Sequence, residues 1–301
     1  MFESKWTPIS RRSFAIKEPA LGKTMLIVDS QVHIWSENTP KHPWPKDHSQ
    51  PHRVVPLMAD ELLREMNQAR VDRTVLVPPY WQGDSNDFSL EAFRKHPDRF
   101  AVMGRIDTSN EASKEKIATW RAEPGLLGIR VVPRRDNVRA QWDSGKIDWL
   151  WAECAKARVP LMVLIDIAQT DQLISVVRRY PDIKIILDHL CLPSRAKDQD
   201  AFGNIEPVLA LAQYPQIAVK ASSMPSFTND IYPFKGLHTQ IRRVYDAFGP
   251  KRMFWGSDLS QLPCTYTQAK HLFTNELVWL TTEDKEWIMG RGICEWIGWP
   301  I

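Results

Sequence analysis

The chain has 301 residues, of which 43% are hydrophobic and 25% charged, and its 39 basic and 36 acidic residues give a net charge of +3. Because the basic residues are scattered rather than gathered into a stripe, the composition argues against a nucleic-acid partner and leaves small anionic molecules. No apolar run approaches the roughly 18 residues that span a bilayer, so we expect no membrane partner either.

The first 24 residues are predicted to form an N-terminal extension. Residues 10–17 (SRRSFAIK) resemble a twin-arginine export motif, but the run EPALGK follows where an export signal needs an apolar stretch. The four cysteines show neither C-x-x-C spacing nor a disulfide framework, which favours a reducing compartment. We therefore expect a cytoplasmic protein whose first strand begins at Met25.

Short apolar strands alternate with helical segments in the first half of the chain. The spacing of Leu62, Leu63, Met66 and Ala69 on one face predicts a helix over Asp60–Ala69. The other helices are expected over Ser89–His96 and Glu111–Trp120. Strands are expected over Met25–Asp29, Thr74–Val77, Phe100–Ile106 and Leu126–Val132.

The second half repeats this alternation. Strands are expected over Leu161–Ile165, Ile183–Leu187, Ile217–Lys220 and Met253–Trp255. Helices are expected over Ile147–Ala157, from a cap at Thr170 to Pro181, and over Ile205–Gln213, Gly236–Phe248, Thr267–Leu277 and Asp284–Met289. Eight buried strands alternating with helices predict an α/β fold with a parallel sheet, and both a closed barrel and an open doubly wound sheet fit. The absence of a glycine-rich phosphate loop argues against a dinucleotide site.

Several polar residues follow directly on the predicted strands. In a barrel, the carboxyl ends of the strands meet at one rim, and enzymes place their chemistry there. Strand periodicity puts Gln31 and His33 on the same, inward side of the first strand. Charged groups at buried strand ends are costly unless they are paired or functional, so their convergence predicts a site. The other members are Arg130, Asp188, His189, Lys220 and Asp258.

At these residues the chain resembles the amidohydrolase superfamily, in particular its lactonase-like branch, which includes sugar lactonases and 2-pyrone-4,6-dicarboxylate lactonase. The resemblance spans roughly residues 25–298 and implies a single (β/α)8 TIM barrel over residues 25–301. It also implies a hydrolase that opens a lactone or related cyclic ester of a small carboxylated substrate. The matching segments are Asp29–Trp35, Gly128–Arg130, Leu187–His189, Lys220–Ser222 and Trp255–Asp258.

The resemblance and the residue chemistry together suggest roles. Asp258 would take a proton from the attacking water, kept ionised near neutral pH by nearby cations. His33 and His189, or a metal that they hold, would stabilise the oxyanion. Arg130 would bind a substrate carboxylate through its planar fork, and Lys220 would add positive charge. Alternatively, both are structural ion-pair partners of buried carboxylates such as Asp29 or Asp188. Further substrate contacts are predicted from Gln31, Trp35 and Trp81, while Trp44, His48, His52 and Tyr80 either line the same pocket or pack the loops onto the rim.

The metal content depends on one departure from the family pattern. Gln31 stands where the family has its first strand-1 histidine, and an amide is a poor ligand for Zn²⁺. We expect no cofactor, or a weakly held divalent metal such as Zn²⁺ on His33, His189 and Asp258.

Two other functions remain open: a non-oxidative decarboxylase of a carboxylated aromatic substrate, and an inactive barrel that binds an anionic ligand. A homo-oligomer is compatible with the sequence. The adjacent Arg134 and Arg135 are interpreted as solvated surface residues.

Overall fold

The structure, a computed structural model, describes residues 25–46 and 51–301, so the predicted extension 1–24 and His48 lie outside the described residues. Its strands form one parallel sheet in the order β1 to β8, with each strand paired to the next along the chain. This sequential order is that of a TIM barrel and excludes the open doubly wound sheet. The strands are β1 (Val28–Val32), β2 (Arg73–Leu76), β3 (Phe100–Gly104), β4 (Leu126–Val131), β5 (Leu161–Val163), β6 (Ile185–Leu187), β7 (Ile217–Ser222) and β8 (Met253–Gly256).

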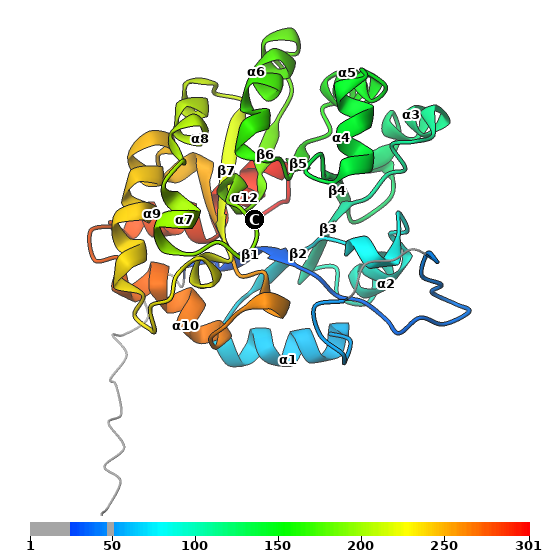
Figure 1. The fold of residues 1–301 in the computed structure, drawn as a ribbon. Helices are drawn as coiled ribbons and strands as arrows, with labels where there is room; N and C mark the ends of the chain where they lie inside the picture. The colour runs from blue at the N-terminus through cyan, green and yellow to red at the C-terminus, as the bar shows by residue number, and fades with distance from the viewer. Residues whose placement is uncertain (1–24, 47–50) are drawn as a thin grey trace, which may run out of the picture.

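Helices between the strands surround the sheet (Figure 1). In α1, Leu62, Met66 and Ala69 are buried on one face, as their spacing predicts, and the helix ends at Arg70 in the left-handed conformation. Thr170 is the first residue of α6 rather than its cap. The helices are α1 (Ala59–Ala69), α2 (Asp87–Lys95), α3 (Lys114–Ile117), α4 (Asp136–Asp143), α5 (Asp148–Ala157), α6 (Thr170–Arg179), α7 (Asp198–Phe202), α8 (Glu206–Ala210), α9 (Lys235–Phe248), α10 (Tyr266–His271), α11 (Thr282–Glu286) and α12 (Gly292–Ile297).

The core has an inner and an outer apolar cluster. The outer one lies between the strands and the surrounding helices. The inner one joins inward-facing strand residues such as Val28 and Phe254 to Ile293 and Ile297 of α12, the red helix that crosses the barrel in Figure 1. Each such side chain contributes roughly 1.5–3 kcal/mol by leaving water. The barrel interior is therefore packed with side chains and is not a pore.

Side-chain hydrogen bonds close the barrel between β1 and β8. The Asp29 carboxylate accepts hydrogen bonds from the Ser257 amide at 2.8 Å and from the Tyr266 hydroxyl at 2.7 Å, while the Ser30 hydroxyl donates to the Trp255 carbonyl at 2.7 Å. β1 begins three residues later than predicted and runs to Val32, which places Gln31 inside the strand. Within the described residues, no helix is long and apolar enough to cross a membrane.

Candidate active site

Three strand ends bring His33, His189 and Asp258 together. The His33 Nε2 atom lies 3.6 Å from Asp258 Oδ1, and the His189 Nε2 atom lies 3.9 Å from Asp258 Oδ2. The backbone is left-handed at His189 (φ 50°) and at Asp258 (φ 52°), a conformation that costs free energy for non-glycine residues and gathers at functional sites. The strained backbone therefore lies at two of the residues that the sequence predicts to converge.

A cavity of about 620 Å³ lies over these three side chains. Arg130 and Trp81, both predicted substrate contacts, are on its wall. Gln31, Trp35 and Lys220 are not, because all three are completely buried beneath it. The Trp35 ring instead packs edge-on against that of Trp81, with ring centroids 5.2 Å apart. These three residues are placed to support the cavity wall rather than to touch its contents.

The loops supply the rest of the wall. His52 and Tyr80 line the cavity, whereas Trp44 does not. The interpretation of Arg134 and Arg135 as solvated residues is wrong: both are half-buried and face the cavity. Their position directly after β4 was the available signal, since the loops after barrel strands form the mouth of the site.

The cavity is strongly cationic. Of its described lining residues, five are basic and one, Asp258, is acidic. Arg134 forms an ion pair with Asp166 at 2.8 Å, and Arg135 stacks on the Tyr80 ring at 3.4 Å. A cleft lined by one sign of charge attracts ligands of the other, so this geometry suits a negatively charged ligand. The five basic residues are Arg130, Arg134, Arg135, Arg195 and Lys197.

Asp188 anchors a buried ion cluster at one side of the site. Its Oδ1 atom lies 2.8 Å from Lys220 Nζ, and its Oδ2 atom accepts a hydrogen bond from Arg130 Nε at 3.0 Å. Burial by itself would raise the pKa of Asp188, but Lys220 and Arg130 outweigh it and the pKa is lowered. Asp188 is therefore a permanently charged structural partner.

Asp258 lacks such close cationic partners. Burial raises its pKa to about 7, against the opposing influence of Arg130 and Lys220. Its Oδ2 atom accepts a hydrogen bond from Gln261 Nε2 at 2.9 Å, while Oδ1 has no hydrogen-bond partner among the described residues. The cations oppose desolvation, as expected, but do not outweigh it, so Asp258 is partly ionised near neutral pH. A carboxyl group with a pKa near the operating pH suits proton transfer.

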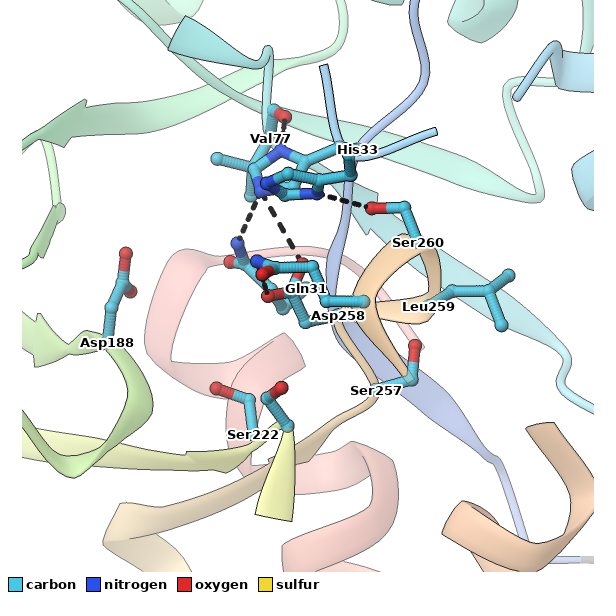
Figure 2. Close-up of polar contacts among 12 residues, drawn as sticks. Gln31, His33, Val77, Asp188, Ser222, Ser257, Asp258, Leu259 and Ser260 are labelled. Carbon is cyan, nitrogen blue, oxygen red and sulfur yellow. Dashed lines mark hydrogen bonds and ion pairs between the residues drawn. The ribbon is translucent and has the colours of Figure 1, made fainter. Parts of the chain in front are cut away.

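The two histidines are neutral. Burial lowers the pKa of His33 well below its ordinary value and lowers that of His189 to about 3. The His33 Nδ1 atom lies 2.6 Å from the Val77 carbonyl, and its Nε2 atom lies 3.2 Å from Gln31 Nε2. Figure 2 shows Gln31 and Asp258 reaching the same edge of the His33 ring, away from Val77. The proton of His33 is thus on Nδ1, and the Nε2 lone pair faces the site.

The model of the family described as Amidohydrolase matches residues 28–291. The chain belongs to the amidohydrolase family. A curated L-fucono-1,5-lactonase from Burkholderia ambifaria is 23% identical to this amidohydrolase over 247 residues, which cover 77% of this chain and 79% of the relative.

Solved amidohydrolase structures share the fold. One from Burkholderia multivorans with bound Zn has a TM-score of 0.75 at 20% identity, covering 91% of this chain and 100% of its own. A probable 2-pyrone-4,6-dicarboxylic acid hydrolase from Acinetobacter baumannii with citric acid bound has a TM-score of 0.73 at 15% identity, with the same coverage. At these identities the likeness establishes the barrel and nothing finer.

The arrangement of this amidohydrolase does not fit a tightly held Zn²⁺. A zinc ligand must offer a free lone pair, but the Nε2 lone pair of His33 already accepts a hydrogen bond from Gln31. The Lys220 ammonium contacts the other end of the same Gln31 amide and would repel a dication. Within residues 25–46 and 51–301, no group of three or more His, Cys, Asp or Glu side chains is arranged as a metal site.

Proposed function

We propose that this amidohydrolase opens a lactone or related cyclic ester of a small carboxylated substrate to give a hydroxy acid. The observation that carries the proposal is the Asp258 carboxyl group, whose pKa of about 7 suits a general base, beside two neutral histidines in a cationic cavity. The activity of the L-fucono-1,5-lactonase relative supports the same reaction class.

In the proposed mechanism, a water molecule lies against the Asp258 carboxylate. Ionised Asp258 takes a proton from the water through Oδ1, which has no hydrogen-bond partner among the described residues, and the water oxygen forms a bond to the substrate carbonyl carbon. The C–O bond to the ring oxygen then breaks, and the leaving alkoxide takes the proton back from Asp258. His33 carries no proton on Nε2, because that lone pair accepts from Gln31, so it cannot take the oxyanion role expected from the sequence.

Oxyanion stabilisation falls to His189 and Arg130 in this mechanism. The Ser222 hydroxyl lies 2.9 Å from His189 Nδ1, and by donating to it leaves the His189 proton on Nε2, which is directed towards Asp258. Arg130 uses Nε to bind Asp188, so its terminal N–H groups are available to a substrate carboxylate or to the developing negative charge. Trp81 supplies an apolar wall.

The variant Asp258→Asn tests the proposal directly. We expect proton release from a panel of carboxylated and sugar lactones by the wild-type protein, and a loss in kcat of about 10²–10⁴-fold in the variant. The far-ultraviolet circular dichroism should be unchanged. Asp200→Asn, the same replacement at an exposed carboxylate, is the matched control and should keep the wild-type rate. A normal rate in Asp258→Asn with the true substrate would exclude the mechanism.

The same panel separates the other functions. Evolution of CO₂ from carboxylated aromatic acids, without proton release from lactones, would identify a decarboxylase. Binding of carboxylates without any turnover would identify an inactive barrel. Elemental analysis and a chelator arm test whether a divalent metal is needed, and we propose that none is, on the ligand chemistry described above.

We further propose a cytoplasmic location and no nucleic-acid or membrane partner. All four cysteines are free, which suits a reducing compartment. Oligomeric state is measurable by sedimentation on the full chain.

A further inference from the structure

Lys220 is completely buried but does not reach the cavity. The groups around its Nζ atom are all acceptors: Asp188 Oδ1 at 2.8 Å, Gln31 Oε1, Met162 Sδ at 3.3 Å and the Ser30 carbonyl at 3.5 Å. A buried ammonium is costly unless it is compensated, and here Asp188 compensates it. Because Lys220 does not line the cavity, it acts on the site through these neighbours and through the long-range attraction of its charge for Asp258.

The contact with Gln31 fixes the direction of a hydrogen-bond chain. An ammonium has only donors, so the atom of Gln31 that faces Lys220 must be its oxygen, and the amide NH₂ must face His33. That NH₂ donates to the Nε2 lone pair of His33, which leaves the ring proton on Nδ1. The Nδ1 proton is donated to the Val77 carbonyl at 2.6 Å.

We propose that Lys220 and Gln31 are positioning residues that hold His33 in its Nδ1–H tautomer. The chain runs from Lys220 on β7, through Gln31 on β1, to His33 and Val77. It leaves no proton on the Nε2 edge of His33, 3.6 Å from Asp258 Oδ1, so His33 does not occupy the carboxylate oxygen that would accept from the attacking water. The catalytic consequence rests on the proposed function, whereas the tautomer itself does not.

This chain of donors also gives a physical role to the replacement of a histidine by Gln31. The Gln31 amide donates to the His33 Nε2 lone pair that a metal would need. Its oxygen accepts from Lys220, so it links the buried ammonium to the His33 ring. The positive charge near His33 is then carried by the Lys220 side chain instead of by a bound metal ion. A glutamine is suited to this position because its amide accepts at one end and donates at the other.

Nuclear magnetic resonance of protein labelled with ¹⁵N-histidine, without substrate, measures the tautomer directly. His33→Asn identifies the His33 signals. In the wild-type protein at pH 7.5 we expect His33 to be neutral with its proton on Nδ1. A proton on Nε2 would overturn the proposal, and this measurement requires no variant of Lys220 or Gln31.

Gln31→Glu is the sharpest variant. An ionised carboxylate still accepts from Lys220 but cannot donate to His33, so the His33 proton should move to Nε2, or a second proton should be taken up. Gln213→Glu is the matched control, since Gln213 is exposed and precedes β7, and it should leave the His33 signals unchanged. Unchanged signals in Gln31→Glu would also overturn the proposal.

Kinetics and metal binding add two independent measurements. If the lactone panel gives a substrate, Gln31→Glu should lower kcat by about 10–100-fold with KM changed less than about threefold, because a proton on His33 Nε2 would be donated to Asp258 Oδ1, the oxygen that has to accept from water. Gln31→His should raise the affinity for Zn²⁺, measured by equilibrium dialysis, by about 10–100-fold. Stoichiometric Zn²⁺ bound through His33 in the wild-type protein would contradict the proposed hydrogen-bond chain. Failure of the lactone panel with the expected tautomer would count against the proposed function alone.

Discussion

Asp188 and Asp258 are the same residue type at the ends of two barrel strands, β6 and β8, and both are completely buried, yet their environments differ. Asp188 has a cation within 3.0 Å of each carboxylate oxygen, and its pKa is lowered. Asp258 has one amide donor and two neutral histidines, and its pKa rises to about 7. Burial alone therefore does not determine whether a carboxylate is structural or reactive.

The difference arises because both nearby cations bind Asp188 and neither binds Asp258. Lys220 on β7 and Arg130 on β4 both turn towards Asp188, so their influence reaches Asp258 only at longer range. Desolvation then dominates at Asp258. An ion cluster next to the site thus provides a fixed electrostatic environment, while the unpaired carboxylate remains able to exchange a proton near neutral pH.

Asp188→Asn should cause the largest loss of folding stability among the variants that test this comparison. The variant leaves Lys220 and Arg130 without their buried counter-charge, and loss of one partner from a buried ion pair costs about 3–5 kcal/mol. Chemical denaturation of the purified protein measures this loss. The control is Asp246→Asn, which removes the exposed partner of Arg242 and should cost less than about 1 kcal/mol. Equal losses for both variants would show that the cluster is not the structural element described here.

Asp258→Asn should have the opposite effect on stability. Between the unfolded pKa near 3.8 and the folded pKa of about 7, the unfolded chain releases the Asp258 proton while the folded chain retains it, so folding stability falls as the pH rises. The cost is complete above pH 7 and absent below pH 4. Asparagine removes it, so the variant should be more stable than wild type by up to about 4 kcal/mol at pH 8.

Thermal unfolding of both proteins at pH 4, 6 and 8 tests the direction of this stability difference. The difference between Asp258→Asn and wild type should grow with pH and then level off. A variant that is less stable than wild type at pH 8 would show that Asp258 is held by favourable interactions like those of Asp188.

Much of the barrel could be predicted from the sequence because its strands are short apolar runs in regular alternation with helices. The ends of β6 and β8 could be identified as carrying Asp188, His189 and Asp258 for the same reason. The start of β1 could not, since Met25 to Ile27 is as apolar as the strand itself. The choice between barrel and open sheet depends on the spatial order of the strands, which no local pattern reveals and which only the family resemblance predicted.

Side-chain partners were harder to predict than positions. Arg130 and Lys220 could be placed at strand ends, with Asp29 or Asp188 as possible ion-pair partners, and the structure shows that Asp188 binds both of them. The orientation of the Gln31 amide depends on a lysine 189 residues away in the chain. The loops that carry Arg195 and Lys197 have no periodicity from which a direction could be inferred, and these residues were missed.

The pH dependence of kcat/KM gives the finest test of the contrast. Asp258 must be ionised to accept a proton, and its pKa is about 7, so the rate should fall tenfold per pH unit below this value. His189 should add no step above pH 5, because burial lowers its pKa to about 3, and burial lowers the pKa of His33 in the same direction. Asp188 should not titrate in this range, since Lys220 and Arg130 hold its pKa low. Rates measured from pH 5.5 to 8.5, corrected for spontaneous lactone hydrolysis, should therefore show one acid limb. A rate that is flat down to pH 5.5 would mean that the cations govern both carboxylates alike.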